Sequence, residues 1–277
     1  GFIYFAWKPL KVLNNHFITK IPQENKVFQC RFIPTGSNYM MEIVYEVEVA
    51  EQPINSERII SIDLGVDNFV TITNNINQQP FVIKGGVIKS VNQYYNKEKA
   101  RIQSQLKTIN KKDWSNRLQR LTDKRNNKIK YLIHVYSKRI MDYCLENGID
   151  TIVCGYKFKE WKQESAMTKK TNQKFITIPY EVFIRQLDYK SLDSGEKFIL
   201  NEESYTSGTS FLDNEEPIKS NYNKSRRVYR GLFKSNTGKL INADVNGSYQ
   251  IMKKVFPNAF ANGIEGVGCH PVSMKIA

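Results

Sequence analysis

Ile59-Ile60-Ser61-Ile62-Asp63-Leu64-Gly65-Val66 is the stretch of sequence that decides the fold. Residues 59–64 form a short run of mostly β-branched apolar residues, which is typical of a buried strand, and Gly65 ends it. Residues 69–73 follow at hairpin distance and predict an antiparallel neighbour. Asp63 is unusual here, because a carboxylate among apolar strand residues is costly unless a cation or a hydrogen-bond donor compensates it. This environment favours a functional role for Asp63.

The elements around these two strands predict one mixed α/β sheet. Three strands in a meander are followed by two helices, a strand, a helix, a strand and a last helix. This is the order of a ribonuclease-H-like domain, in which acidic residues at the strand ends can converge on metal ions. The other predicted elements are a hairpin of residues 29–34 and 39–47 around Thr35-Gly36-Ser37-Asn38, strands at 81–83, 151–154 and 198–200, and helices at 94–110, 116–147 (capped by Ser115), 179–189 and 245–255.

The chain is strongly basic. Its 277 residues carry 41 Lys and Arg against 27 Asp and Glu, and a net charge of +14 favours a polyanionic partner such as nucleic acid or an anionic membrane surface. Residues 84–139 hold sixteen basic residues and three acids, and residues 219–254 hold nine and one. A solvated surface is the plainer interpretation of any single one of them. The candidate nucleic-acid contacts are Lys111, Lys112, Arg117, Arg120, Lys124, Arg125, Lys128, Arg226, Arg227 and Arg230.

Several classes of protein are disfavoured by what the sequence lacks. It has no apolar run of about 18 residues, so we expect no membrane-spanning helix, and the N-terminus has no signal-peptide pattern. Cys30, Cys144, Cys154 and Cys269 form no C-x-x-C pair, which argues against a zinc ribbon and against a disulfide framework. We therefore expect a reducing compartment and no zinc.

Acidic residues stand at predicted strand and helix ends. Asp63 lies in the first buried strand. Glu202 and Glu203 directly follow the strand that ends at Leu200, and Asp244 precedes the last helix. Phosphodiester hydrolysis uses two hard cations about 3.5–4 Å apart, and carboxylate oxygens suit Mg²⁺. Each acid also has a plainer interpretation: Asp63 as part of a turn, Glu202 and Glu203 as surface charges, and Asp244 as a helix cap.

The joint order of several motifs resembles the TnpB (OrfB) family of transposon-encoded proteins, which are related to Fanzor proteins and to type V CRISPR effectors. Ile62-Asp63-Leu64-Gly65-Val66, with Thr71, is similar to the first RuvC motif of that family, and residues 241–249 are similar to the third. The other segments that carry the resemblance are Tyr94-Tyr95-Asn96-Lys97, Thr151-Ile152-Val153-Cys154-Gly155, Trp161-Lys162-Gln163, Ile178-Pro179-Tyr180, Leu187-Asp188-Tyr189-Lys190 and Glu202-Glu203-Ser204-Tyr205-Thr206-Ser207.

The resemblance also implies the ligands of the metal. Many members carry the catalytic Glu just after the strand that matches residues 151–154, where this chain has Gly155. Some TnpB branches and the Fanzor proteins place it just before a Tyr-Thr-Ser segment, which here is residues 205–207. The implied catalytic residues and Mg²⁺ ligands are Asp63, Glu203 and Asp244, with Glu202 in reserve.

The chain departs from the family pattern in two further places. Cysteines of the family's zinc ribbon are missing at Ser207-Gly208-Thr209-Ser210, so residues 204–240 are expected to form a ribbon-like insert without zinc. Residues 1–57 resemble the last part of a wedge-like β-barrel, which predicts an N-terminally truncated protein followed by a RuvC-like domain at 58–277 with a helical hairpin at 90–147. The apolar residues expected to pack in place of zinc are Phe211, Leu212, Val228, Tyr229, Leu232 and Phe233.

Three functions compete. The resemblance implies a Mg²⁺-dependent, RNA-guided DNA endonuclease of the prokaryotic cytoplasm, associated with the nucleoid, with an element-derived guide RNA and a double-stranded DNA target. A nuclease-inactive relative that only binds nucleic acid is the second interpretation, which the missing N-terminal portion favours. The third is an actin-like-fold ATPase, since such folds also place Asp-Leu-Gly on the first strand. The glycines at residues 263–268, however, follow the last helix and precede no other.

Overall fold

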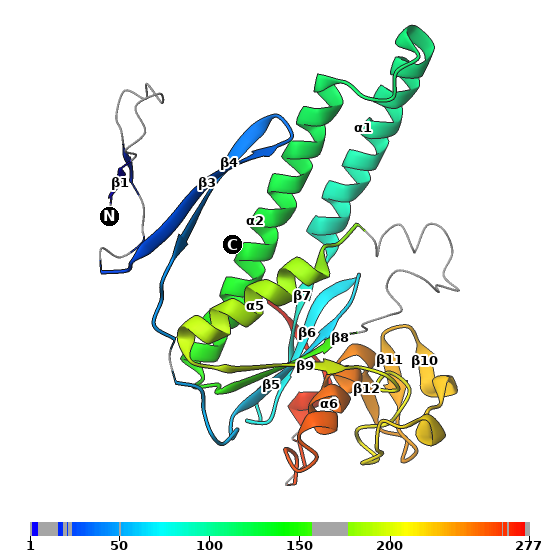
Figure 1. Cartoon of the computed structure of the whole chain (residues 1–277). Coiled ribbons are helices and arrows are strands. Elements are labelled where there is room, and N and C mark those ends of the chain that lie inside the picture. The colour runs from blue at the N-terminus through cyan, green and yellow to red at the C-terminus, as the bar shows by residue number, and fades with distance from the viewer. Residues whose placement is uncertain are drawn as a thin grey trace.

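The computed structural model describes residues 2–4, 16–18, 21, 24–49, 51–156, 177–261, 263–264 and 266–274 (Figure 1). Trp161-Lys162-Gln163, one of the segments that carry the family resemblance, lies outside the described residues. The strands are β1 (Phe2–Tyr4), β2 (His16–Ile18), β3 (Val27–Thr35), β4 (Asn38–Tyr45), β5 (Ile59–Leu64), β6 (Asn68–Asn74), β7 (Phe81–Lys84), β8 (Thr151–Tyr156), β9 (Lys197–Glu202), β10 (Arg227–Tyr229), β11 (Leu232–Lys234), β12 (Leu240–Asn242) and β13 (Val272–Ser273). The helices are α1 (Gly86–Asn110), α2 (Asn116–Glu146), α5 (Tyr180–Ser194) and α6 (Ala243–Val255), with short 3₁₀ turns η1 (Lys219–Asn221), η2 (Lys224–Arg226) and η3 (Gly266–Cys269).

Strand β5 lies inside a mixed sheet of six strands in the order β13-β7-β6-β5-β8-β9. β5, β6 and β7 form the antiparallel meander, whereas β8 joins parallel to β5 and β9 joins parallel to β8. The predicted mixed α/β sheet is confirmed, and β13 adds a short parallel edge beside β7 that the sequence did not predict. No helix in the described ranges is long and apolar enough to cross a bilayer.

Alternate residues of β5 face two different layers. Ile60 and Ile62 belong to a buried apolar cluster that includes side chains of α2 and α5. Ser61 points to the opposite face, where its hydroxyl lies 2.7 Å from Thr73 Oγ1 and donates a 2.6 Å hydrogen bond to the Ser248 carbonyl of α6. The sheet is therefore the middle of three layers, with α2 and α5 on one face and α6 on the other (Figure 1).

Helices α1 and α2 form the predicted helical hairpin, which projects away from the sheet (Figure 1). Lys111 adopts φ +51° at the end of α1, and Ser115 caps α2 by accepting a 3.2 Å hydrogen bond from the Leu118 amide. Helix α1 begins at Gly86 rather than at the predicted residue 94. The reason is that Ile88 is buried in the core, so tertiary packing extends the helix back to the glycines.

The β3–β4 hairpin, which the sequence predicted, attaches its turn to α2. Gly36 has φ +61°, and a Cβ atom there would overlap Gln119 Nε2 and Asp123 Oδ1, so this position requires glycine. The Asp123 carboxylate accepts hydrogen bonds from the Ser37 amide at 3.1 Å and from the Ser37 hydroxyl at 2.5 Å. The turn is thereby fixed to the side of the helical hairpin.

The insert that was expected to resemble a zinc ribbon forms a small sheet of β10, β11 and β12 beside α6 (Figure 1). Phe211 and Phe233 are buried in one cluster with Tyr249, whose ring stacks on Phe211 at a centroid distance of 4.5 Å. These two phenylalanines therefore pack as predicted. The predicted packing of Val228 and Tyr229 is wrong, because both lie on the edge strand β10 and are 57% and 64% exposed.

A half-buried polar cluster holds this insert together. Glu215 Oε2 accepts hydrogen bonds from Arg226 Nη1 at 2.7 Å and from the Ser210 amide at 2.8 Å, and Glu215 Oε1 accepts one from Asn236 Nδ2 at 3.2 Å. The Arg226 and Glu215 side chains are only 15% and 16% exposed. Burial acts to raise the pKa of the Glu215 carboxyl, but the hydrogen bonds from Arg226 and Ser210 hold this pKa below its ordinary value.

We expect Glu215→Gln to lower the free energy of unfolding by about 1–3 kcal/mol at pH 7, the usual cost of losing hydrogen bonds to a charged group. Because the folded-state pKa of Glu215 is lowered, its stabilising effect is present above the unfolded pKa of about 4.3 and is lost as the pH falls through the folded value. The difference from the unmodified chain should therefore shrink below about pH 4. Urea unfolding between pH 3 and 7 measures it.

The exposed neighbour Glu216 supplies the matched control, since Glu216→Gln removes a charge from the same segment without touching the cluster. A penalty for Glu215→Gln that stays constant across this pH range, or equals that of Glu216→Gln, would contradict the stabilising role of the ion pair.

Candidate active site and nucleic-acid interface

Asp63 is half-buried near the carboxyl end of β5, opposite Thr71 of β6. It faces α6, because a Cβ atom built at Gly247 of that helix lies 3.1 Å from Asp63 Oδ2. Such a distance is tight for a real Cβ contact, so a side chain at position 247 would crowd the carboxylate. Gly247 therefore gives the Asp63 carboxylate its room against the helix backbone.

Glu203 follows the last residue of β9 and lies over the end of β8. A Cβ atom built at Gly155 lies 3.0 Å from Glu203 Oε2 and overlaps the Cδ1 atom of Ile251, a fully buried residue of α6. The Glu203 carboxylate and Ile251 thus fill the space that a side chain at position 155 would need. Gly155 is also the position at which many TnpB relatives were expected to carry their catalytic Glu.

Glu202 is engaged elsewhere. Its Oε2 atom forms an ion pair with Lys254 Nζ at 3.0 Å, and its Oε1 atom accepts hydrogen bonds from the Ser204 amide, at 3.1 Å, and from the Ser204 hydroxyl. Partial burial acts to raise the pKa of Glu202, but the bonds from Ser204 and Lys254 lower it overall. Of the two adjacent acids, Glu203 is therefore the one directed over the neighbouring strand.

The Asp63 and Glu203 carboxylates act on the same neighbouring groups. Burial raises the pKa of the Cys154 thiol, and the charges of Glu203 and Asp63 raise it further. Burial also raises the pKa of the Tyr180 phenol, followed by the charges of Asp63, Glu203 and Asp67. The strand register agrees: Ile62 of β5 pairs with Cys154 of β8, so Asp63 lies beside Gly155, the residue over which the Glu203 carboxylate lies. Asp63 and Glu203 are therefore at the same end of the sheet.

Asp244 lies in the first turn of α6, but it does not cap the helix. The side chain of Asn242 is the cap, since its oxygen accepts hydrogen bonds from the amides of Asp244 and Val245 at 3.0 and 3.2 Å. Asp244 Oδ2 instead accepts a 2.7 Å bond from Asn68 Nδ2, and Asn68 Oδ1 accepts one from Lys84 Nζ at 2.8 Å. The capping interpretation of Asp244 is therefore wrong, and its carboxylate lies beside the start of β6.

No group of three His, Cys, Asp or Glu side chains within the described ranges is close enough together to hold a metal ion. Asp63 and Glu203 share one end of the sheet, whereas the Asp244 carboxylate is turned to Asn68. All three donors are carboxylate oxygens, which is the ligand type that Mg²⁺ prefers, so the residues fit that ion chemically. Metal ligation by these three residues stays a prediction.

Tyr180 is a residue of this region whose role the sequence did not predict. Its hydroxyl donates a 2.8 Å hydrogen bond to the carbonyl of Gly65, in the turn after β5, and its ring stacks on Phe69 at a centroid distance of 5.7 Å. It fixes the turn that follows Asp63. In the sequence, Tyr180 stands out only as part of the Ile178-Pro179-Tyr180 segment that carries the family resemblance. Its contact with Gly65 could not be predicted, because the two residues lie far apart in the chain.

The basic residues predicted to contact nucleic acid divide by environment. Arg125 is half-buried, and its guanidinium donates hydrogen bonds to Asn92 Oδ1 at 2.8 Å, to Asn126 Oδ1 at 2.9 Å and to the Thr177 carbonyl at 2.6 Å. Burial lowers the pKa of Arg125. Its donors hold α1, α2 and the segment before α5 together, so Arg125 has a structural role in this arrangement.

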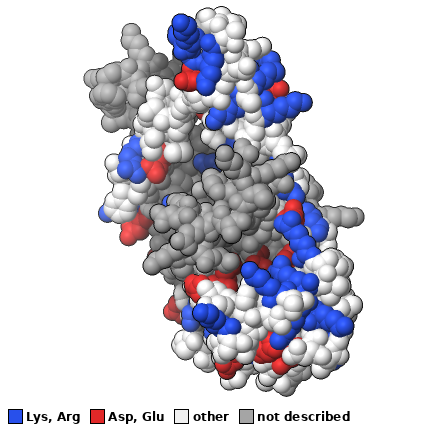
Figure 2. All heavy atoms as spheres, turned by 90° about the vertical axis from the view of Figure 1, so that its right-hand side faces the viewer, with Lys and Arg blue, Asp and Glu red and all other residues white. Residues whose placement is uncertain are grey.

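The other predicted residues of the helical hairpin are exposed. Lys111, Lys112 and Arg117 lie at its far end, where Figure 2 shows Lys and Arg gathered. Arg120, Lys124 and Lys128 recur every four residues along α2, which places them on one face of the helix. This surface is a continuous row of positive charge available to an anion.

Two of the three predicted arginines in the β10–β11 region form ion pairs with acidic side chains. Arg226 is held by Glu215, and Arg230 Nη2 pairs with Asp67 Oδ2 at 2.7 Å. Arg227 is half-buried on β10. Figure 2 shows a second gathering of Lys and Arg over this part of the molecule. The Arg230–Asp67 pair links the insert to the turn after β5, next to the candidate active site.

Residues 42–160 match the family model of the OrfB_IS605 proteins, described as probable transposases. This segment, which contains the whole of β5 through β8, is similar to the OrfB-type family, and the resemblance drawn from the sequence is confirmed to that extent. No match is found among curated proteins.

Two solved structures share the fold. The first is the cryo-EM structure of a Cas12f1–sgRNA–target DNA complex, with a TM-score of 0.53 and 18% identity over 78% of this chain and 54% of that chain. The second is the cryo-EM structure of a CRISPR-Cas12f ternary complex, with a TM-score of 0.56 and 17% identity over 80% of this chain and 44% of that chain. The present chain thus spans about half the length of these proteins.

We expect Gly155→Ala to lower the free energy of unfolding by about 1–3 kcal/mol, because the added methyl group must displace Ile251 or the Glu203 carboxylate in a filled space. Gly86→Ala is the matched control, since a Cβ atom at Gly86 meets nothing within 4 Å. Thermal and urea unfolding of the two variants measure the difference. Equal stabilities would show that the space over Gly155 is not filled as described.

Proposed function

We propose that this chain is the ribonuclease-H-like (RuvC) nuclease portion of a TnpB-like, RNA-guided DNA endonuclease that hydrolyses phosphodiester bonds with Mg²⁺. The observation that carries the proposal is the placement of Asp63 and Glu203. Both are carboxylates at one end of the sheet, on or directly after the strands that flank β8, in a chain that matches the OrfB family model across the strand that carries Asp63. Asp244 completes the proposed set from the adjacent end of α6.

The proposed metal ligands come from three elements of the fold. Asp63 presents its carboxylate from β5, against Gly247. Glu203 presents its carboxylate from the end of β9, above Gly155. Bound Mg²⁺ would activate water and stabilise the leaving 3′ oxygen. To join the set, the Asp244 carboxylate would give up the hydrogen bond that it accepts from Asn68. The side-chain amide of Asn68 would then donate to water instead. Tyr180 keeps the turn after Asp63 in position.

A guide RNA and a double-stranded DNA target are the proposed partners. The two similar structures are named as complexes with an sgRNA and target DNA or as a ternary complex. The net charge of +14 and the exposed basic row on α2 supply the electrostatic attraction that a nucleic-acid backbone requires. Activity of the whole protein with these partners is part of the proposal.

A cleavage assay with RNA co-purified from cells that express the gene with its flanking sequence tests the proposal. We expect Glu203→Gln and Asp63→Asn each to slow Mg²⁺-dependent DNA cleavage by at least about 100-fold. The reason is that mutating a residue that only orients a metal ligand already lowers metal affinity or activity by about 10- to 100-fold. RNA binding should be unchanged. Glu202→Gln is the control, because Glu202 is paired with Lys254 and should leave cleavage within about threefold of the unmodified chain.

Two outcomes would contradict the proposal. Cleavage that survives Glu203→Gln but falls with Glu202→Gln would move the site to the other acid. RNA and DNA binding without any cleavage by the unmodified chain would identify a nuclease-inactive relative.

A further inference from the structure

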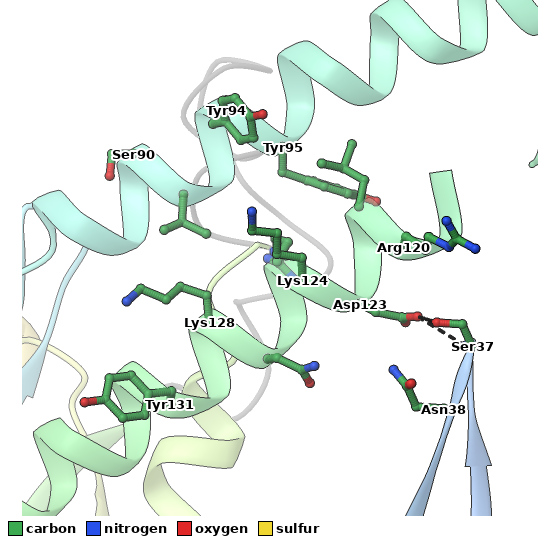
Figure 3. Close-up of a pocket in the computed structure, with 14 residues that line it drawn as sticks. Ser37, Asn38, Ser90, Tyr94, Tyr95, Arg120, Asp123, Lys124, Lys128 and Tyr131 are labelled. Carbon is green, nitrogen blue, oxygen red and sulfur yellow. Dashed lines mark hydrogen bonds between the residues drawn. The ribbon is translucent and has the colours of Figure 1, made fainter. Parts of the chain in front are cut away.

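A groove lies between the β3–β4 turn and the helical hairpin, away from the candidate active site. Its volume is about 1270 Å³, and side chains from β3–β4, α1 and α2 line it. Figure 3 shows Ser37 and Asn38 at one end, Tyr94 on α1, and Lys124, Lys128 and Tyr131 along α2. The groove is larger than a single side chain or a buried water requires, so it has room for a ligand.

One side of the groove is a row of cations. Arg120, Lys124 and Lys128 are exposed and follow one another at four-residue spacing, which separates them by about 6 Å each along the helix axis. None of the three takes part in an ion pair in the part of the chain that the structure describes. Figure 3 shows Lys124 and Lys128 extending from α2 into the space between the helices. These charges are available to phosphates.

The other feature of the groove is a pair of exposed tyrosines. Tyr94 and Tyr131 are 62% and 58% exposed, although both line the groove. Lys128 Nζ lies 5.4 Å from the centroid of the Tyr131 ring, so a cation and an aromatic face are already adjacent. Tyr95, by contrast, is half-buried, and its hydroxyl lies 3.1 Å from Thr122 Oγ1. Tyr94 and Tyr131 are thus the rings that a ligand can reach.

Asp123, the acidic residue that lines the groove, already accepts hydrogen bonds from its neighbours. The Asp123 carboxylate accepts hydrogen bonds from Ser37 and from Gln119 Nε2, and the bonds from Ser37 hold its pKa below the ordinary value. Its charge is directed to the β3–β4 turn (Figure 3). The three exposed cations outweigh this one acid, so the groove attracts anions.

We propose that this groove binds an unpaired stretch of nucleic acid, with bases stacked on Tyr94 and Tyr131 and phosphates bound by Arg120, Lys124 and Lys128. A duplex would use the cations but would leave both rings without a partner, because its bases stack on one another. An unpaired strand uses both features, since aromatic rings stack on exposed bases while basic side chains follow the backbone. The inference rests on the proposed function for the identity of the strand, which is either a segment of guide RNA or the displaced DNA strand.

Binding of fluorescent 12-nucleotide single-stranded RNA, single-stranded DNA and duplex DNA to the RNA-free full chain, in EDTA, tests the proposal. We expect Tyr94→Ala and Tyr131→Ala each to weaken single-strand binding by about 5- to 100-fold, with little effect on duplex binding. Tyr94→Phe and Tyr131→Phe keep the rings and should bind normally. Tyr39→Ala is the matched control, because Tyr39 is 77% exposed on β4 and does not line the groove.

The salt dependence separates the two kinds of contact. The double variant Lys124→Ala/Lys128→Ala should reduce the slope of log affinity against log salt by about 0.7 for each lost single-strand contact, whereas the tyrosine variants should leave the slope unchanged. Lys138→Ala/Arg139→Ala removes the same charge from α2 outside the groove and serves as its control. A larger loss for RNA than for DNA indicates a guide segment, and the reverse indicates the displaced strand.

Three results would overturn the proposal. The tyrosine-to-alanine variants could lose affinity for single strands and duplex equally, or lose no more affinity than Tyr39→Ala. Alternatively, their single-strand binding could stay unchanged while their binding of poly-glutamate falls, which would assign the groove to an acidic protein. Since no cleavage is measured, failure of the nuclease proposal leaves this test valid. A failure here likewise leaves the roles of Asp63 and Glu203 untouched.

Discussion

Strand β5 packs against an apolar layer on one face and, on the other, against α6 through both apolar side chains and a buried group of hydroxyls, and the rest of the structure depends on this second contact. The hydroxyl groups of Ser61, Thr73 and Ser248 are fully buried and hydrogen-bonded to one another. Such a cluster is stable only when every member has a partner, so it fixes where α6 sits on the sheet. That position brings Gly247 over Asp63 and Ile251 over Gly155.

Much of the fold could be predicted from local pattern. The meander, the helical hairpin with its Ser115 cap and the β3–β4 turn all follow from short-range periodicity and turn residues. The differences arise where packing decides. Helix α5 continues past the predicted residue 189 to end before Gly195, whose φ is +86°, and β13 exists only because β7 offers it an edge.

The candidate site was predictable as a list of acids but not as an arrangement. Sequence comparison could favour Glu203 over Glu202, but the contact that occupies Glu202 comes from Lys254, on the last turn of α6. The partner of Asp244, Asn68, and the bond from Tyr180 to Gly65 join segments that are more than a hundred residues apart. No local pattern encodes such pairs, because they arise only when the sheet and α6 assemble.

Competition for space over β8 also constrains how this site can change over evolutionary time. A side chain at position 155 would overlap Ile251 and would press against the Glu203 carboxylate, so the three positions share one space. A chain that acquired a carboxylate at 155 while keeping Glu203 would pass through a crowded intermediate with two acids in one space. These positions are therefore epistatic, since the residue that is tolerated at 155 depends on which residues occupy 203 and 251.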